Sequence, residues 1–312
     1  MTPFAFVFPG QGSQSVGMLD AWGDHPAVRQ ALAEASDALD QDLTHLIHAG
    51  PKEALDLTTH TQPVMLAAGI ACYRAWLAEG GPEPAAMAGH SLGEYTALVA
   101  AGALSLADAM PIVRFRAQAM QEAMPAGAGA MAAIIGLDAT TVRQLCVDVV
   151  ARSGEVVAPA NFNDVKQIVI SGTTAGVNMA CEVLKAHGAK RALRLAVSAP
   201  FHSSLMKPAA EALRQRLEVV PFKTPRLPVV NNVDVAVQTT PEAIRDALVR
   251  QAFGPVRWVE VMQALRTRGL SHIVECGPGK VLANLARRMD SELVVGAVHD
   301  PASLAETKGL LA

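Results

Sequence analysis

The 312-residue sequence is poor in aromatic side chains, which make up 4% of it, and it has four scattered cysteines. Cys72, Cys146, Cys181 and Cys276 form no Cys-x-x-Cys pair, so they indicate neither a disulfide framework nor a zinc site. We therefore expect reduced, mostly buried thiols in a cytoplasmic protein and no bound metal.

The sequence also lacks a basic excess and a long apolar run. Its 26 Lys and Arg residues against 29 Asp and Glu residues give a net charge of −3, which argues against a general nucleic-acid binder. Residues 95–107 are too few to span a bilayer, and no basic segment precedes the first apolar run, so we expect neither a membrane span nor a signal peptide. Half of the chain is apolar and rich in alanine, which favours a helix-rich α/β protein with one or two domains.

The most informative segment is Gly89-His90-Ser91-Leu92-Gly93, which fits the Gly-x-Ser-x-Gly nucleophile elbow. Residues 84–88 before it read as a short strand, and residues 94–101 after it read as a helix of mainly small side chains. In such a turn the positive end of the new helix points at chemistry on Ser91. The context predicts a nucleophilic serine on an α/β-hydrolase-like core.

The order of predicted elements indicates two structural units. Strand Phe4–Phe8, a helix that opens at the capping box of Ser105, and alternating strands and helices after residue 206 predict a mostly parallel sheet. Between them, strands at 131–136, 156–160, 167–171 and 191–197 and helices at 140–151 and 174–187 give the order β-α-β-β-α-β, with Asn161–Asp164 between two strands. We expect an α/β-hydrolase-like core of residues 1–126 and 198–312, with an inserted ferredoxin-like βαββαβ subdomain of residues 127–197.

A serine needs a base to become a good nucleophile at neutral pH. His90 is a poor candidate, because neighbouring side chains at a sharp turn point apart. His202 is better placed, in the loop of residues 198–203 at the subdomain boundary, where clefts form; the alternative is a loop histidine bonded to backbone. The closest downstream carboxylate is Glu211, so a Ser-His-Asp triad is not evident.

Two arginines interrupt an apolar helix. Arg114 and Arg116 are two residues apart and so face nearly opposite sides, and at most one of them can reach a given pocket. A guanidinium binds a carboxylate through two parallel hydrogen bonds, so one of them could read an acidic substrate, whereas an exposed arginine is the plainer alternative. The loop Gly277–Lys280 lacks the spacing of a phosphate-binding fingerprint and reads as a tight turn and helix cap.

These segments together resemble the malonyl-CoA:acyl carrier protein transacylases of bacterial fatty acid synthesis. The likeness covers essentially the whole chain, and an inserted ferredoxin-like subdomain is a feature of that family. The segments that carry it are Phe8–Gln14, Gly89–Glu94, Phe115-Arg116, Val197–Pro208, Asn231–Val233, Gln251 with Pro255–Trp258, and Glu275–Lys280.

The resemblance implies a role for each matching residue. Ser91 would attack the malonyl thioester, and His202 would act as its base. The backbone N–H groups of Gln11 and Leu92 would form the oxyanion hole. Arg116 would bind the malonyl carboxylate, and the backbone carbonyl of Gln251 would orient His202 in place of an aspartate.

The resemblance also implies the partners. Malonyl-CoA would be the substrate, and an acidic acyl carrier protein would bring its phosphopantetheine thiol past Asn161 and Asn163. No cofactor would be bound permanently, and the protein would be a monomer. Phe201 departs from the small residue often found before the histidine in standalone members, which bears on the choice of acyl group. Candidates for a basic patch that meets the carrier are Lys190, Arg191, Lys280, Arg287 and Arg288.

Three alternatives stay open at this point. An accessory transferase that loads malonyl onto a polyketide or malonate-decarboxylase carrier would use the same chemistry. A serine esterase or thioesterase shares the elbow but normally has an acid between its serine and histidine in the sequence. A non-enzymatic binding module would not become acylated on Ser91.

Overall fold

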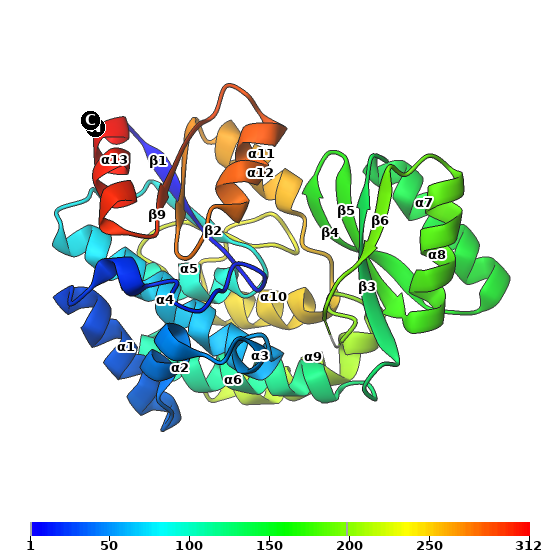
Figure 1. Cartoon of the computed structure of the whole chain (residues 1–312), viewed down its shortest axis with the longest axis horizontal. Coiled ribbons are helices and arrows are strands. Elements are labelled where there is room, and N and C mark those ends of the chain that lie inside the picture. Colours follow the sequence, from blue (N-terminus) through cyan, green and yellow to red (C-terminus); the bar gives the residue numbers. More distant parts are fainter. Residues whose placement is uncertain (1, 198) are drawn as a thin grey trace.

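The computed structural model describes residues 2–197 and 199–312, which build two sheets (Figure 1). The first is a five-stranded parallel sheet in the order β7-β2-β1-β8-β9. Its strands are β1 (Phe4–Phe8), β2 (Ala86–Gly89), β7 (Val229–Val230), β8 (His272–Cys276) and β9 (Val294–Val298). The predicted α/β class with a parallel core sheet is confirmed. Ser198, where the second core segment was predicted to begin, lies outside the described residues.

Strand β1 is buried on both faces, as its unbroken apolar run predicts. Successive side chains of a strand point to opposite faces. The phenylalanines of β1 therefore pack against α4 (Thr58–Ala78), where the Phe6 and Trp76 ring centroids are 5.5 Å apart. Ala5 and Val7 face α11 (Trp258–Thr267) and α12 (Val281–Met289) on the other side. Strand β1 therefore lies between two apolar cores, where it pairs with β2 from Ala5 to Phe8.

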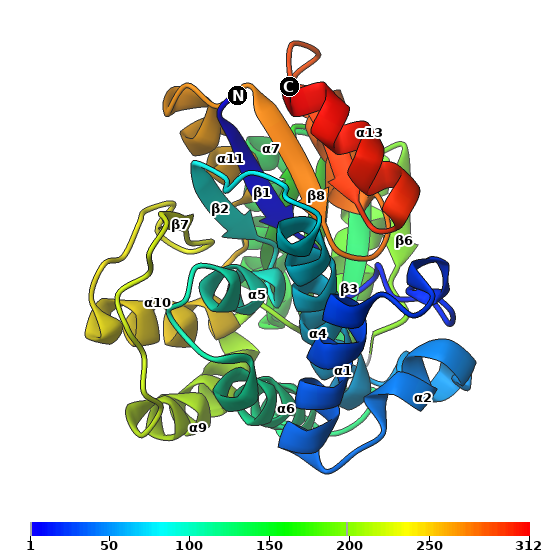
Figure 2. The ribbon, with the colours of Figure 1, turned by 90° about the vertical axis from the view of Figure 1, so that its left-hand side faces the viewer.

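Of the remaining core helices, α5 (Gly93–Ala100) and α13 (Pro301–Leu311) pack on this sheet and the others form a layer against α4 and one another, and α13 brings the end of the chain beside its start (Figure 2). Thr2 N donates to Leu311 O at 3.2 Å. The Ser105 side chain caps α6 as predicted, accepting from Asp108 N at 3.0 Å. In the described residues, no helix combines the length and the apolar composition that a bilayer span requires. Besides α4, α5, α11, α12 and α13, the helices of the core are α1 (Pro26–Leu39), α2 (Leu43–Ala49), α3 (Lys52–Leu55), α6 (Leu106–Glu122), α9 (Lys207–Glu218) and α10 (Pro241–Phe253).

The second sheet is antiparallel, in the order β4-β5-β3-β6, and it has its own apolar core (green in Figure 1). Its elements run in the predicted β-α-β-β-α-β order of a ferredoxin-like unit. They fall within the range 127–197, although the limits of that subdomain stay a prediction. The elements are β3 (Gly129–Ile135), α7 (Ala139–Ser153), β4 (Val157–Asp164), β5 (Gln167–Thr173), α8 (Thr174–Ala186) and β6 (Arg191–Arg194).

The prediction that Asn161–Asp164 connects two strands is wrong, because β4 continues to Asp164. Two register shifts along β4 obscure its alternation in the sequence. Phe162 packs into the subdomain core, and its N–H donates to Val256 O at 2.9 Å. Strand β4 is thus tied to the core segment before α11, and this contact carries Asn161 and Asn163 to the edge of a cavity that Ser91 and His202 also line.

Candidate active site

The tight turn between β2 and α5 places Ser91 at the tip of a strand–turn–helix unit. Ser91 has φ of 52°, in the left-handed region that costs a non-glycine residue about 1–2 kcal/mol. A Cβ at Gly89 would lie 1.9 Å from the carbonyl carbon of Gly93, and a Cβ at Gly93 would lie 2.1 Å from Phe8 O. Both glycines of the motif are therefore required by close backbone approach, and the predicted elbow is present.

The hydroxyl of Ser91 meets His202, which the sequence places 111 residues away. Ser91 Oγ lies 2.7 Å from His202 Nε2. On the other side of the ring, Nδ1 lies 2.9 Å from Gln251 O and 3.2 Å from Gly254 O. Since carbonyl oxygens only accept hydrogen bonds, Nδ1 carries the hydrogen and Nε2 is left as the acceptor that faces the serine.

The surroundings of His202 keep its ring neutral. The side chain is buried, and burial together with the nearby charge of Arg116 lowers the pKa of His202 to about 3. His90 points elsewhere, with its Nε2 2.8 Å from Asn163 Oδ1, which agrees with the expectation that it is not the base. His202 is thus neutral, and able to accept a proton at Nε2, at neutral pH.

Arg116 is the only one of the two predicted arginines at the site. Its NH2 group lies 3.1 Å from Ser91 Oγ and 3.0 Å from Gln251 Oε1, and NH1 donates to Gln62 Oε1 at 2.7 Å. Arg114 instead bonds Gln41. The guanidinium of Arg116 is 1% exposed, and these acceptors are neutral oxygens. Among the described residues no carboxylate contacts this guanidinium directly, and Glu94 is separated from it by the side chain of Gln251, so the site can take up an anionic group at Arg116.

A cavity of about 160 Å³ opens beside Ser91 and His202. Gln11 and Leu92 line it, and in the described residues no protein acceptor receives the backbone N–H of either. The subdomain contributes Asn161 and Asn163 to the same cavity. Its apolar wall is formed by Met120, Met131, Val169, Leu195, Val197 and Phe201.

The comparisons with known proteins agree with this geometry. A model of the acyl transferase domain family matches residues 5–304. The malonyl CoA-acyl carrier protein transacylase of Escherichia coli (strain K12) is 51% identical over 98% of each chain, and that of Bacillus subtilis (strain 168) is 46% identical over 97% of this chain and 96% of its own.

Solved structures show the same fold along the whole chain. The acyl-carrier-protein S-malonyltransferase from Burkholderia pseudomallei 1710b has a TM-score of 0.97 and 61% identity, covering 99% of this chain and 100% of its own. A malonyl-transacylase in complex with its type II PKS acyl-carrier protein has a TM-score of 0.96 and 48% identity, covering 99% of each chain. The chain belongs to the acyl transferase family. It is an enzyme, and the esterase and binding-module alternatives are set aside.

Three further side chains support the site of this acyl transferase, and the sequence had assigned a role to none of them. Gln62 accepts from Arg116, as described above. Asn232 Oδ1 accepts from Ser91 N at 2.7 Å, while its Nδ2 donates to Gly89 O at 2.7 Å. Glu94 lies beneath the elbow, 2% exposed, and burial raises its pKa to about 7. For Glu94 the sequence offers one signal of a supporting role, which is a carboxylate in a helix of mainly small side chains directly after the elbow.

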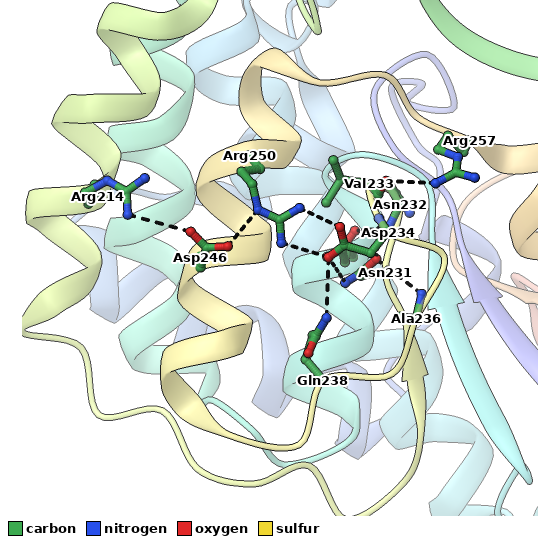
Figure 3. Close-up of polar contacts among 11 residues, drawn as sticks. Arg214, Asn231, Asn232, Val233, Asp234, Ala236, Gln238, Asp246, Arg250 and Arg257 are labelled. Carbon is green, nitrogen blue, oxygen red and sulfur yellow. Dashed lines mark hydrogen bonds and ion pairs between the residues drawn. The ribbon is translucent and has the colours of Figure 1, made fainter.

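The loop that carries Asn232 is fastened to α10, the helix that carries Gln251 (Figure 3). Arg250 binds the carboxylate of Asp234 through two parallel hydrogen bonds of 2.5 and 2.8 Å, and its Nε donates to Asp246 at 2.6 Å. Such bidentate pairs are geometrically specific. The contact therefore sets the position of the loop relative to the last turn of α10. That turn contains Gln251, whose backbone carbonyl is one of the two that face His202 Nδ1.

Proposed function

We propose that this acyl transferase moves a malonyl group from malonyl-CoA to the phosphopantetheine thiol of an acyl carrier protein, through a malonyl ester on Ser91. The observation that carries the proposal is the buried guanidinium of Arg116, 3.1 Å from Ser91 Oγ and bonded to neutral oxygens. An acyl group that ends in a carboxylate would supply the missing anion. The names of the relatives, which are malonyl transferases, support the same substrate.

The first half-reaction acylates the enzyme. His202 Nε2 takes the hydroxyl proton while Ser91 Oγ attacks the thioester carbon. The carbonyl oxygen becomes negatively charged and is met by the N–H groups of Gln11 and Leu92. The C–S bond then breaks, and His202 returns the proton to the sulfur of coenzyme A.

The second half-reaction reverses these steps with a different thiol. The phosphopantetheine thiol, which reaches the cavity past Asn161 and Asn163, gives its proton to His202 and attacks the ester. The ester C–O bond breaks, and Ser91 Oγ takes the proton back. The two thioesters are similar in energy, so no resident cofactor or other energy source is needed.

Arg116 couples substrate choice to the strength of the base. Burial lowers the pKa of His202, and the positive charge of Arg116 lowers it further. A malonyl carboxylate bound to Arg116 offsets that charge, so the pKa of His202 rises toward its ordinary value and Nε2 becomes a stronger base. Acyl groups without a carboxylate leave the base weaker.

A carrier of fatty acid synthesis is the expected partner. A polyketide carrier is the second candidate, because a neighbour of 48% identity was solved with a type II PKS carrier protein. Transfer rates from the malonylated enzyme to the two purified holo-carriers decide between them, the physiological carrier being the faster acceptor.

Intact-mass spectrometry tests the reaction class. After mixing with malonyl-CoA, the enzyme should gain the mass of one malonyl group, and Ser91→Ala should gain none. Labelling that persists in Ser91→Ala would show another nucleophile, and rapid hydrolysis of malonyl-CoA without an acceptor thiol would indicate a thioesterase.

A further inference from the structure

Glu94 is a buried carboxylate at the site that the proposed reaction does not use. It lies in the first turn of α5, three residues after the nucleophile, and is 2% exposed. Its Oε2 accepts two hydrogen bonds, from Asn232 N at 2.8 Å and from Gln251 Nε2 at 2.9 Å. The carboxylate thus joins two segments that are distant in sequence, the loop after β7 and the end of α10.

The same two partners hold both sides of the Ser91 backbone. Asn232 Oδ1 accepts from Ser91 N at 2.7 Å, and Gln251 Nε2 donates to Ser91 O at 3.0 Å. Glu94, Asn232, Ser91 and Gln251 therefore form a closed ring of hydrogen bonds. Ser91 has the left-handed φ of 52°, a conformation that persists only where surrounding contacts fix it.

We propose that Glu94 is a positioning residue: its carboxylate holds Asn232 and Gln251 in the orientation in which they fix the backbone of Ser91. This inference rests on the proposed function, in which Ser91 is the nucleophile. Glu94 does not touch the reacting atoms: its carboxylate bonds Asn232 and Gln251, whereas the hydroxyl of Ser91 bonds His202 and Arg116.

The chemistry of an amide explains why a carboxylate stands at this place. The amide of Gln251 has a donor end and an acceptor end of nearly equal shape. Its Nε2 faces Glu94 Oε2 and Ser91 O, and its Oε1 accepts from Arg116 at 3.0 Å. A turned amide would place its oxygen against two acceptors, and an ionised carboxylate, which only accepts, makes that orientation the more unfavourable.

Two variants of Glu94 separate position from charge. Glu94→Gln keeps an oxygen in place but removes the charge, whereas Glu94→Asp keeps the charge and withdraws the oxygens by one methylene. The matched control is Glu275→Gln, which makes the same change in a carboxylate that is also buried but bonds Ala283 N at the start of α12, at 2.8 Å.

The assay is single-turnover acylation of the full-length enzyme at about pH 8, with malonyl-CoA and with acetyl-CoA, alongside thermal unfolding. We expect Glu94→Asp to lower the acylation rate about tenfold or more for both substrates, and Glu94→Gln to lower it by less. The malonyl-CoA concentration that gives half of the maximal acylation rate should change by less than about twofold, because the ring acts on the nucleophile and not on substrate binding. Glu275→Gln should acylate at the wild-type rate.

The outcomes distinguish the inference from the function beneath it. Wild-type rates in Glu94→Asp, or a loss confined to malonyl-CoA, would overturn the positioning role, the second by showing that Glu94 acts as a counter-charge to Arg116. A fall in stability without a fall in the acylation rate of folded enzyme would overturn it too. Failure of the wild-type enzyme to acquire any acyl group on Ser91 would instead overturn the proposed function.

Discussion

Replacing Arg116 with alanine should change which acyl group the enzyme accepts. The substitution removes a fully buried cation whose NH2 group lies 3.1 Å from Ser91 Oγ. A hydrogen bond to a charged group contributes about 1.5–3 kcal/mol, which corresponds to about a 10- to 150-fold change in rate. Because only malonyl-CoA has a carboxylate to lose this contact, we expect the ratio of malonyl to acetyl transfer to fall by about that factor.

The chain offers a matched control two residues away. Arg114 lies on the same helix but bonds Gln41, away from the cavity, so Arg114→Ala should leave the ratio unchanged. The measurement is kcat/KM for acylation with each CoA thioester, for the wild-type enzyme and for both variants. Working with the ratio cancels any general loss that follows from leaving the oxygens of Gln62 and Gln251 without a donor.

Equal losses with malonyl-CoA and acetyl-CoA in Arg116→Ala would refute the reasoning. That result would mean that Arg116 serves the geometry of Ser91 and does not read the carboxylate. A fall in the ratio in Arg114→Ala as large as that in Arg116→Ala would contradict it equally, since the effect would then belong to the helix as a whole.

Three further predictions concern the elbow, the base and the carrier. Gly93→Ala would place a Cβ 2.1 Å from Phe8 O, so it should lower the free energy of unfolding by roughly 3 kcal/mol or more. The control is Gly309→Ala, at an exposed glycine of α13 with open space around it, which should not lower the free energy of unfolding in the same denaturant titration. Burial, followed by the charge of Arg116, lowers the pKa of His202 from 6.5 to about 3, so the neutral ring stabilises the fold above pH 6.5 and that stability is lost as pH falls from 6.5 toward 3. The wild type should therefore lose up to about 1.4 kcal/mol per pH unit more than His202→Ala in this range, and parallel stability curves would disprove the burial of a neutral ring. Transfer to an acidic carrier should slow with added salt while transfer to a small thiol does not, because salt screens the attraction between the carrier and exposed basic side chains. The basic side chains concerned are the exposed Lys190, Arg191, Lys280, Arg287 and Arg288. Equal salt dependence of the two reactions would count against a basic docking patch.

Much of the fold could be predicted from local patterns. Strand β1 has the predicted bounds Phe4–Phe8, because its unbroken apolar run ends at a turn that contains proline and glycine. The short helices α2 and α3 escaped prediction, since four to seven residues carry too little periodicity. The predicted strand ends at residue 160 whereas β4 continues to Asp164, because the polar side chains of Asn161 and Asn163 face the cavity and not the core.

The residues of the site could also be predicted only in part. Ser91, His202 and Arg116 belong to patterns that chemistry or family resemblance makes recognisable, and the structure brings all three together. The supporting contacts of Asn232 and Glu94 could not be read from the sequence, because they depend on which distant segments meet. Asn232 follows Ser91 by 141 residues in the chain, and it reaches Ser91 N only because β7 lies beside β2 in the sheet.

The most direct test of the central claim is a chase experiment on the isolated acyl-enzyme. The enzyme is loaded with labelled malonyl-CoA, freed of coenzyme A and its thioesters, and mapped by peptide mass spectrometry before and after addition of holo-carrier. We predict that the malonyl group is found on Ser91 and then passes to the carrier thiol in one turnover. Transfer that requires malonyl-CoA and carrier to be present together, with no labelled Ser91, would contradict the account.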